Sequence, residues 1–157
     1  MIMNYLKSAL CILGVVGVTS LAYAKPVKFN HSGVQVGKLV ESCYRNPCSG
    51  AKVVGFKQLN KSKDSSMLEL TLLGYSRDWN VKRKDWNKSK HKIFITCSIQ
   101  APTVTVDGQV TTLPINPEMV MSGVLQTDYM FYVSACHGGY MDETKLAKKF
   151  GYDVTDW

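Results

Sequence analysis

The cysteines constrain the fold of this chain more than any other feature. The sequence has 157 residues and five cysteines, and the first, Cys11, lies in an N-terminal apolar run. That run follows one basic residue, Lys7, and ends in a small-x-small site at Ala24, which is the pattern of a cleaved secretory signal peptide. It is too short to span a membrane, since a spanning helix needs about 20 apolar residues. We therefore expect residues 1–24 to be removed and the mature chain, residues 25–157, to be periplasmic or secreted.

Four cysteines remain after this cleavage, and an even number in an oxidising compartment favours two disulfides. Cys97 and Cys136 lie in segments with the pattern of buried strands, so we expect them to bridge neighbouring strands or facing sheets. Cys43 and Cys48 are then left to pair with each other, although the sequence leaves the other connectivities open. From loop-closure entropy, we expect the first bridge to add about 4 kcal/mol to the free energy of unfolding and the second about 2 kcal/mol.

The mature chain of 157 − 24 = 133 residues suits one domain, and no Pro/Gly/Ser-rich linker divides it. Its pattern predicts a mainly β (α+β) fold, a single small antiparallel β domain with a short helix near each end. Asp107-Gly108 lies between alternating segments and favours a tight hairpin turn. The strands are expected at residues 51–60, 66–75, 92–99 and 128–136, and in a hairpin over residues 103–113.

Two segments have helical signals. Apolar residues at i, i+3, i+4 and i+7 predict a short helix over residues 34–43, although this segment also allows a strand. Near the C-terminus, Asp142 is placed as an N-cap and Gly151 as a stop, with lysines in the last turn between them. We therefore expect one helix before the first strands and one at the end of the chain.

The positive charge is concentrated in one stretch. The mature chain carries 18 basic and 12 acidic residues, because Lys7 is lost, and residues 77–92 hold seven basic and two acidic residues, or +5 of the net +6. This stretch repeats a tetrapeptide, Arg-Asp-Trp-Asn and Lys-Asp-Trp-Asn, seven residues apart. A helix or a hairpin would gather the two indoles among cations, unless both tryptophans face the core. The candidate binding residues here are Arg77, Trp79, Lys82, Arg83, Lys84 and Trp86.

A second candidate surface lies between the first two mature cysteines. A Cys43–Cys48 bridge would close a small ring around Tyr44, Arg45 and a turn-prone Asn-Pro pair. The ring adds less to global stability than the other bridge, so its expected effect is mainly local. We expect it to present Tyr44 and Arg45 to a partner in one fixed shape.

The sequence gives little support for catalysis, a metal or a cofactor, and we expect none of them. The C-x4-C spacing differs from the C-x-x-C of disulfide oxidoreductases, which sits at a helix N-terminus. Zinc sites usually combine two close ligand pairs, whereas the mature histidines, His31, His91 and His137, are scattered. A thiol-dependent enzyme using Cys43 with Cys48, or Cys136 with His137, stays as an alternative.

Export, four cysteines, a β-rich core and a basic face make the chain similar to small periplasmic inhibitor and immunity proteins, by size, compartment and architecture only. This similarity implies a non-enzymatic binding protein that captures a protein partner with an acidic surface, such as an envelope-acting enzyme. An alternative is a protein that binds an anionic polymer, either nucleic acid or an envelope polymer, because cations and exposed tryptophans also suit such a ligand.

Overall fold

The fold is built on one antiparallel sheet whose six strands follow each other in chain order, β1-β2-β3-β4-β5-β6. The computed structural model describes residues 27–118 and 120–155; the expected signal peptide, residues 1–24, lies outside them. The strands are β1 (Leu39–Ser42), β2 (Cys48–Lys61), β3 (Ser65–Arg77), β4 (Asp85–Ser98), β5 (Thr103–Val106) and β6 (Gln109–Thr112). The helices are η1 (Ser32–Val34), η2 (Gly123–Leu125), α1 (Gln126–His137) and α2 (Glu143–Phe150).

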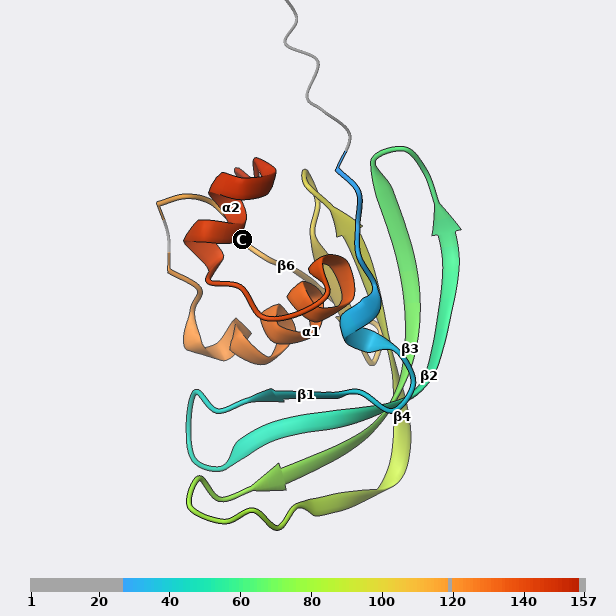
Figure 1. Cartoon of the computed structure of the whole chain (residues 1–157), viewed down its shortest axis with the longest axis vertical. Coiled ribbons are helices and arrows are strands. Elements are labelled where there is room, and N and C mark those ends of the chain that lie inside the picture. Colours follow the sequence, from blue (N-terminus) through green and yellow to red (C-terminus); the bar gives the residue numbers. More distant parts are fainter. Residues whose placement is uncertain (1–26, 119, 156–157) are drawn as a thin grey trace, which may run out of the picture.

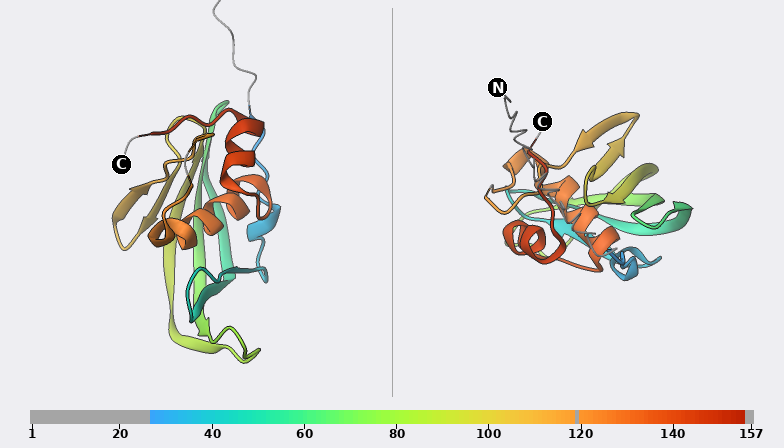
Figure 2. Two further views of the ribbon diagram at one scale, coloured as in Figure 1. Left: turned by 90° about the vertical axis from the view of Figure 1, so that its left-hand side faces the viewer. Right: turned by 90° about the horizontal axis from the view of Figure 1, so that it is seen from above.

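The three long strands bend around the helices (Figure 1). The pairing register shifts between Val53 and Gly55 in β2 and between Leu73 and Tyr75 in β3. An extra residue in one strand bends it and increases its twist. The upper part of the sheet therefore stands beside the helices, and the lower part, with β1 at its edge, runs beneath α1 (Figures 1 and 2).

The core lies between the inner face of the sheet and α1. Leu68, Leu70 and Leu72 alternate with more exposed residues along β3 and have no exposed surface, as the strand period of two requires. Seven of the twelve residues of α1 are buried. The Cys97–Cys136 disulfide ties β4 to α1 with a Cα–Cα distance of 5.5 Å, so the predicted pairing is confirmed. It joins a strand to a helix, however, and not two strands.

Two element predictions were wrong. Residues 128–136 form most of helix α1 and not a strand, because a helix buried on most sides carries apolar residues all round and loses its 3.6-residue period. Residues 34–43 contain no α-helix: η1 ends at Val34, Gly37 has a φ of 96°, and β1 follows. Leu39 is half exposed in β1 although the helical pattern placed it on the apolar face.

The mainly β fold with an antiparallel sheet, two disulfides and some helix is confirmed. Asp107 and Gly108 form the β5–β6 turn with positive φ at both residues, 49° and 81°. The side chain of Asp142 accepts a hydrogen bond from the Lys145 amide at the start of α2, and Gly151 ends that helix in the left-handed conformation. The Cys43–Cys48 disulfide is also present, in the loop between β1 and β2.

Candidate functional site

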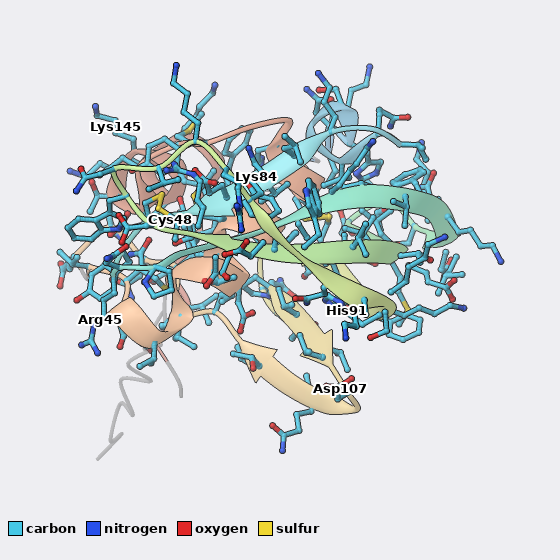
Figure 3. All side chains as sticks on the ribbon, turned by 90° about the horizontal axis from the view of Figure 1, so that it is seen from below. Arg45, Cys48, Lys84, His91, Asp107 and Lys145 are labelled. Atoms are coloured by element: carbon cyan, nitrogen blue, oxygen red, sulfur yellow. A yellow bond between two sulfur atoms is a disulfide. The ribbon has the colours of Figure 1, made fainter. Side chains whose placement is uncertain are left out.

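The two surfaces expected from the sequence lie side by side at one end of the molecule. Residues 43–48 connect β1 to β2, and residues 77–86 form the end of the β3–β4 hairpin. Because β2 and β3 are antiparallel neighbours with Cys48 opposite Arg77, these two connections meet at the lower end of the sheet (Figures 1 and 3). We call residues 43–48 and 77–86 together the basal surface.

A straight row of directly paired residues supports the basal surface. Glu41 in β1 is opposite Gly50 in β2, Gly50 is opposite Tyr75 in β3, and Tyr75 is opposite Trp86 in β4. The Tyr75 ring lies over Gly50, where a Cβ would come within 2.6 Å of the phenol ring and 2.8 Å of the Val40 carbonyl oxygen. Glycine at position 50 is therefore what lets the tyrosine lie flat across the sheet and reach Glu41.

The carboxylate of Glu41 stabilises this row by bonding to both Tyr75 and Arg77. Its carboxylate accepts hydrogen bonds from Arg77 Nε at 2.7 Å and from the Tyr75 hydroxyl at 2.8 Å, and Arg77 Nη2 completes a two-pronged ion pair. The hydrogen bond from Arg77 lowers the pKa of Glu41, while burial and the carboxylate raise the pKa of Tyr75. Arg77, predicted as a binding residue, thus stabilises the surface through its ion pair with Glu41.

Asn46 joins the two loops. Its side-chain amide donates to Asp78 Oδ2 at 2.9 Å, and its carbonyl oxygen accepts from the Trp79 backbone amide at 3.0 Å. The hydrogen bond from Asn46 also lowers the pKa of Asp78. Arg77 Nη1 donates to the backbone carbonyls of Asp78 and Trp79, each at 3.3 Å. The backbone that carries Trp79 is therefore fixed by two side chains, Arg77 at the end of β3 and Asn46 from the other loop.

The two tryptophans are both partly exposed, and they differ in their surroundings. Trp79 is 53% exposed and Trp86 is 42% exposed, so neither faces the core. Trp86 packs on Tyr75 with ring centroids 4.9 Å apart. Among the described residues, no aromatic contact joins Trp86 to Trp79, so the β3–β4 hairpin does not pair the two indole rings. Trp79 instead lines a shallow hollow of about 260 Å³ with Arg77 and the Cys43–Cys48 disulfide.

Most cations of the basal surface are exposed, although several of them also have partners within the chain. Lys82 and Arg83 are exposed, and Arg83 makes one solvent-exposed ion pair, 3.6 Å from Asp85. Lys84 lies over the Tyr75 ring, 5.2 Å from its centroid, and is less exposed. Arg45 lies 5.6 Å from the centroid of the Tyr44 ring. Positive charge therefore lies beside the exposed Tyr44 ring and on the loop that carries Trp79.

One neighbouring segment was not found from the sequence. The Tyr44 ring packs on Gly123, where a Cβ would overlap its atoms. Val120 and Val124 in the same segment are 76% and 82% exposed, so an apolar area adjoins Tyr44. The only sequence signal was an apolar run, "VMSGVL", outside the expected strands. Apolar residues in a loop do not indicate by themselves which other loop they contact.

Thiol and metal chemistry find little support in this geometry. Glu41, Cys43 and Cys48 have ligand atoms within 4.8 Å of one another, but the two sulfurs are bonded together and the carboxylate is held by Arg77. Cys136 beside His137 is likewise in a disulfide and has no exposed surface. Each described cysteine is thus oxidised, and a thiol mechanism would need prior reduction.

A Ser–His contact lies at the opposite end of the sheet. His31 Nδ1 lies 2.6 Å from the Ala135 carbonyl oxygen, and His31 Nε2 lies 3.3 Å from Ser66 Oγ. Ser66 is only 3% exposed, and its hydroxyl also accepts a hydrogen bond from Gln58 at 2.8 Å. These contacts satisfy polar groups where the core meets the N-terminal segment, and we assign them a structural role.

In the described part of the chain, no helix has the length and apolar character needed to cross a membrane. Comparison with protein-family models, with curated proteins and with solved structures gave no match to this chain.

Proposed function

We propose that this chain is an exported, non-enzymatic binding protein whose basal surface captures an acidic protein partner. The partner class we favour is an envelope-acting enzyme, so that the chain serves as an inhibitor or immunity-type protein. One observation carries the proposal: two loops far apart in sequence are joined by hydrogen bonds into a single surface that exposes aromatic rings and cations.

Three physical properties of this surface suit a protein partner. Tryptophan, tyrosine and arginine provide most of the binding energy at protein interfaces, and Trp79, Tyr44 and Arg45 are exposed here. The hydrogen bonds through Asn46 fix the loop before binding, which reduces the entropy lost on association. Lys82 and Arg83 would attract an acidic surface over a longer range and raise the rate of encounter.

The first test is capture of a partner from an envelope extract of the producing cell by the oxidised, immobilised chain. The matched variants are Trp79→Ala, on the basal surface, and Leu59→Ala, a 47% exposed residue of β2 toward its opposite end. We expect one wall- or membrane-acting enzyme to be retained by wild type and Leu59→Ala and lost by Trp79→Ala. The purified enzyme should lose activity when the wild-type chain is added.

Two results would count against this function. Equal retention by Trp79→Ala would remove the basal surface from the interface. Displacement of the captured protein by a 20-nucleotide oligo-dT strand, with affinity that falls steeply as salt rises, would favour the anionic-polymer alternative. The same oligonucleotide added to the isolated chain measures that alternative directly.

A further inference from the structure

The Cys43–Cys48 disulfide lies within the basal surface, and its neighbours are the groups that fix Trp79. Asn46 lies inside the ring that this disulfide closes, and its side chain makes both hydrogen bonds to the other loop. The disulfide itself lines the hollow with Trp79, and Arg77 Nη2 lies 3.5 Å from Cys43 Sγ. The conformation of the ring and the position of Trp79 are therefore linked by direct contacts.

We propose that oxidation of Cys43 and Cys48 assembles the basal surface, and that its reduction by a dithiol dismantles it. This inference rests on the proposed function, since it describes the regulation of the same surface. The dithiol breaks the Sγ–Sγ bond and is itself oxidised to a disulfide. Two electrons and two protons pass to the protein, which then carries two thiols.

The physical reason is the conformational freedom of the β1–β2 loop. Backbone pairing holds Ser42 opposite Ser49, so the ends of the loop stay together after reduction. The residues between them lose the bridge that restricts them and gain backbone conformational freedom. The loop must then be ordered again, at a cost in conformational entropy, before Asn46 can bond to both Asp78 and the Trp79 amide.

The two disulfides differ in their access to a reductant. Thiol–disulfide exchange requires a thiolate to reach one of the sulfurs. Cys43 is exposed, whereas Cys97 in β4 and Cys136 in α1 have no exposed surface. A mild dithiol therefore reduces Cys43–Cys48 first and leaves the core disulfide intact. The basal surface responds to the redox state while the fold is retained.

The test compares four forms of the full exported chain: wild type, Cys43→Ser/Cys48→Ser, Asn46→Ala and the combination of these changes. Amide exchange of Trp79, measured by NMR, reports the hydrogen bond to Asn46. We expect the Trp79 amide to exchange at least about tenfold faster in the serine variant and in Asn46→Ala, with little further change on combination. Core amides of β3 that still exchange far more slowly than the Trp79 amide show that the fold persists.

A second form avoids substitution altogether: dithiothreitol at a concentration that leaves Cys97–Cys136 intact by mass spectrometry, followed by alkylation. The captured partner should bind this form and the serine variant about tenfold more weakly than the oxidised chain. Equal binding, or a Trp79 amide that exchanges at the wild-type rate in both forms, would overturn the inference. If the oxidised wild type captures no partner, the proposed function fails, and amide exchange still decides whether the disulfide assembles the surface.

Discussion

At the scale of single residues, the repeated tetrapeptide divides its two tryptophans between two tasks. Trp86 packs on Tyr75, which in turn bonds to Glu41, so this indole is part of the support. Trp79 is more exposed, and its position is fixed through its backbone amide and carbonyl rather than through its ring. The two identical residues of the repeated motif, Trp79 and Trp86, thus have different surroundings, which the sequence alone did not reveal.

This difference predicts unequal stability effects. Trp86→Ala should lower the free energy of unfolding by about 1–2 kcal/mol, because it removes a ring contact and uncovers Tyr75. Trp79→Ala should change it by less than about 0.5 kcal/mol, as exposed substitutions usually do. Urea unfolding of both variants is the measurement, and an equal loss in the two would contradict the assignment.

A second residue-scale prediction concerns His137. Its Nε2 lies 2.7 Å from the Tyr152 hydroxyl, and burial, with a smaller effect of Lys149, lowers its pKa to about 4 from 6.5. The unfolded chain therefore binds a proton before the folded chain as the pH falls. The free energy of unfolding should decrease by about 1 kcal/mol per pH unit from about 6.5 down toward about 4.

Urea unfolding at pH 7, 6 and 5 measures this slope. Three carboxyls have lowered pKa values: Glu41, Asp78 and Asp142. They change the free energy of unfolding mainly at lower pH, because they are charged in both the folded and the unfolded chain until the pH approaches their pKa values in the unfolded chain. His137→Gln is the control, and it should flatten the dependence over this range. A slope that survives in His137→Gln would assign the effect to another group.

At the scale of elements, alternating patterns and turn signals predicted most of the strands. The same patterns could not identify the buried helix α1. The β5–β6 hairpin was predictable because Asp107 and Gly108 specify a local turn. Helix α1 was not, because its apolar residues lie on most of its circumference and its β-branched and aromatic content resembles that of a strand. Only tertiary packing inside the bend of the sheet decides that residues 126–137 are helical.

The row of paired residues across the lower sheet predicts the effect of a single methyl group. Gly50→Ala places a Cβ against the Tyr75 ring and the Val40 carbonyl, so the row must shift. We expect a loss of about 1–3 kcal/mol in the free energy of unfolding. Gly139→Ala is the control, since nothing lies within 4 Å of its added Cβ. Equal stability of the two variants in urea would show that the row is more adaptable than its geometry suggests.

At the scale of the whole molecule, the two disulfides serve different purposes. Cys97–Cys136 closes a loop of 39 residues' separation in the core, whereas Cys43–Cys48 closes one of five. By loop-closure entropy, Cys97→Ser/Cys136→Ser should cost about 4 kcal/mol and Cys43→Ser/Cys48→Ser about 2 kcal/mol. Urea unfolding ranks the two variants, and a larger loss from the Cys43–Cys48 pair would reverse the roles proposed for them.

The candidate site could be predicted only in parts. Charge, the repeated tetrapeptide and the C-x4-C spacing identified the two loops separately, because each is a local pattern. That the two loops form one surface depends on the pairing of β2 with β3, which places Cys48 opposite Arg77, and on the hydrogen bonds of Asn46. The apolar area at Gly123 and Val124 depends on contact between elements far apart in the chain. Such long-range contacts leave no local signal in one sequence.

The most direct test of the central claim is the association rate of the captured partner with two charge-reversal variants. Lys82→Glu/Arg83→Glu changes the basal surface without disturbing Lys84 on Tyr75, and Lys61→Glu/Lys63→Glu makes the same change in net charge at the β2–β3 loop, at the opposite end (Figure 1). At low salt, the basal variant should associate about tenfold more slowly than wild type, and the control should associate at nearly the wild-type rate. Equal rates for the two variants would contradict capture by the basal surface.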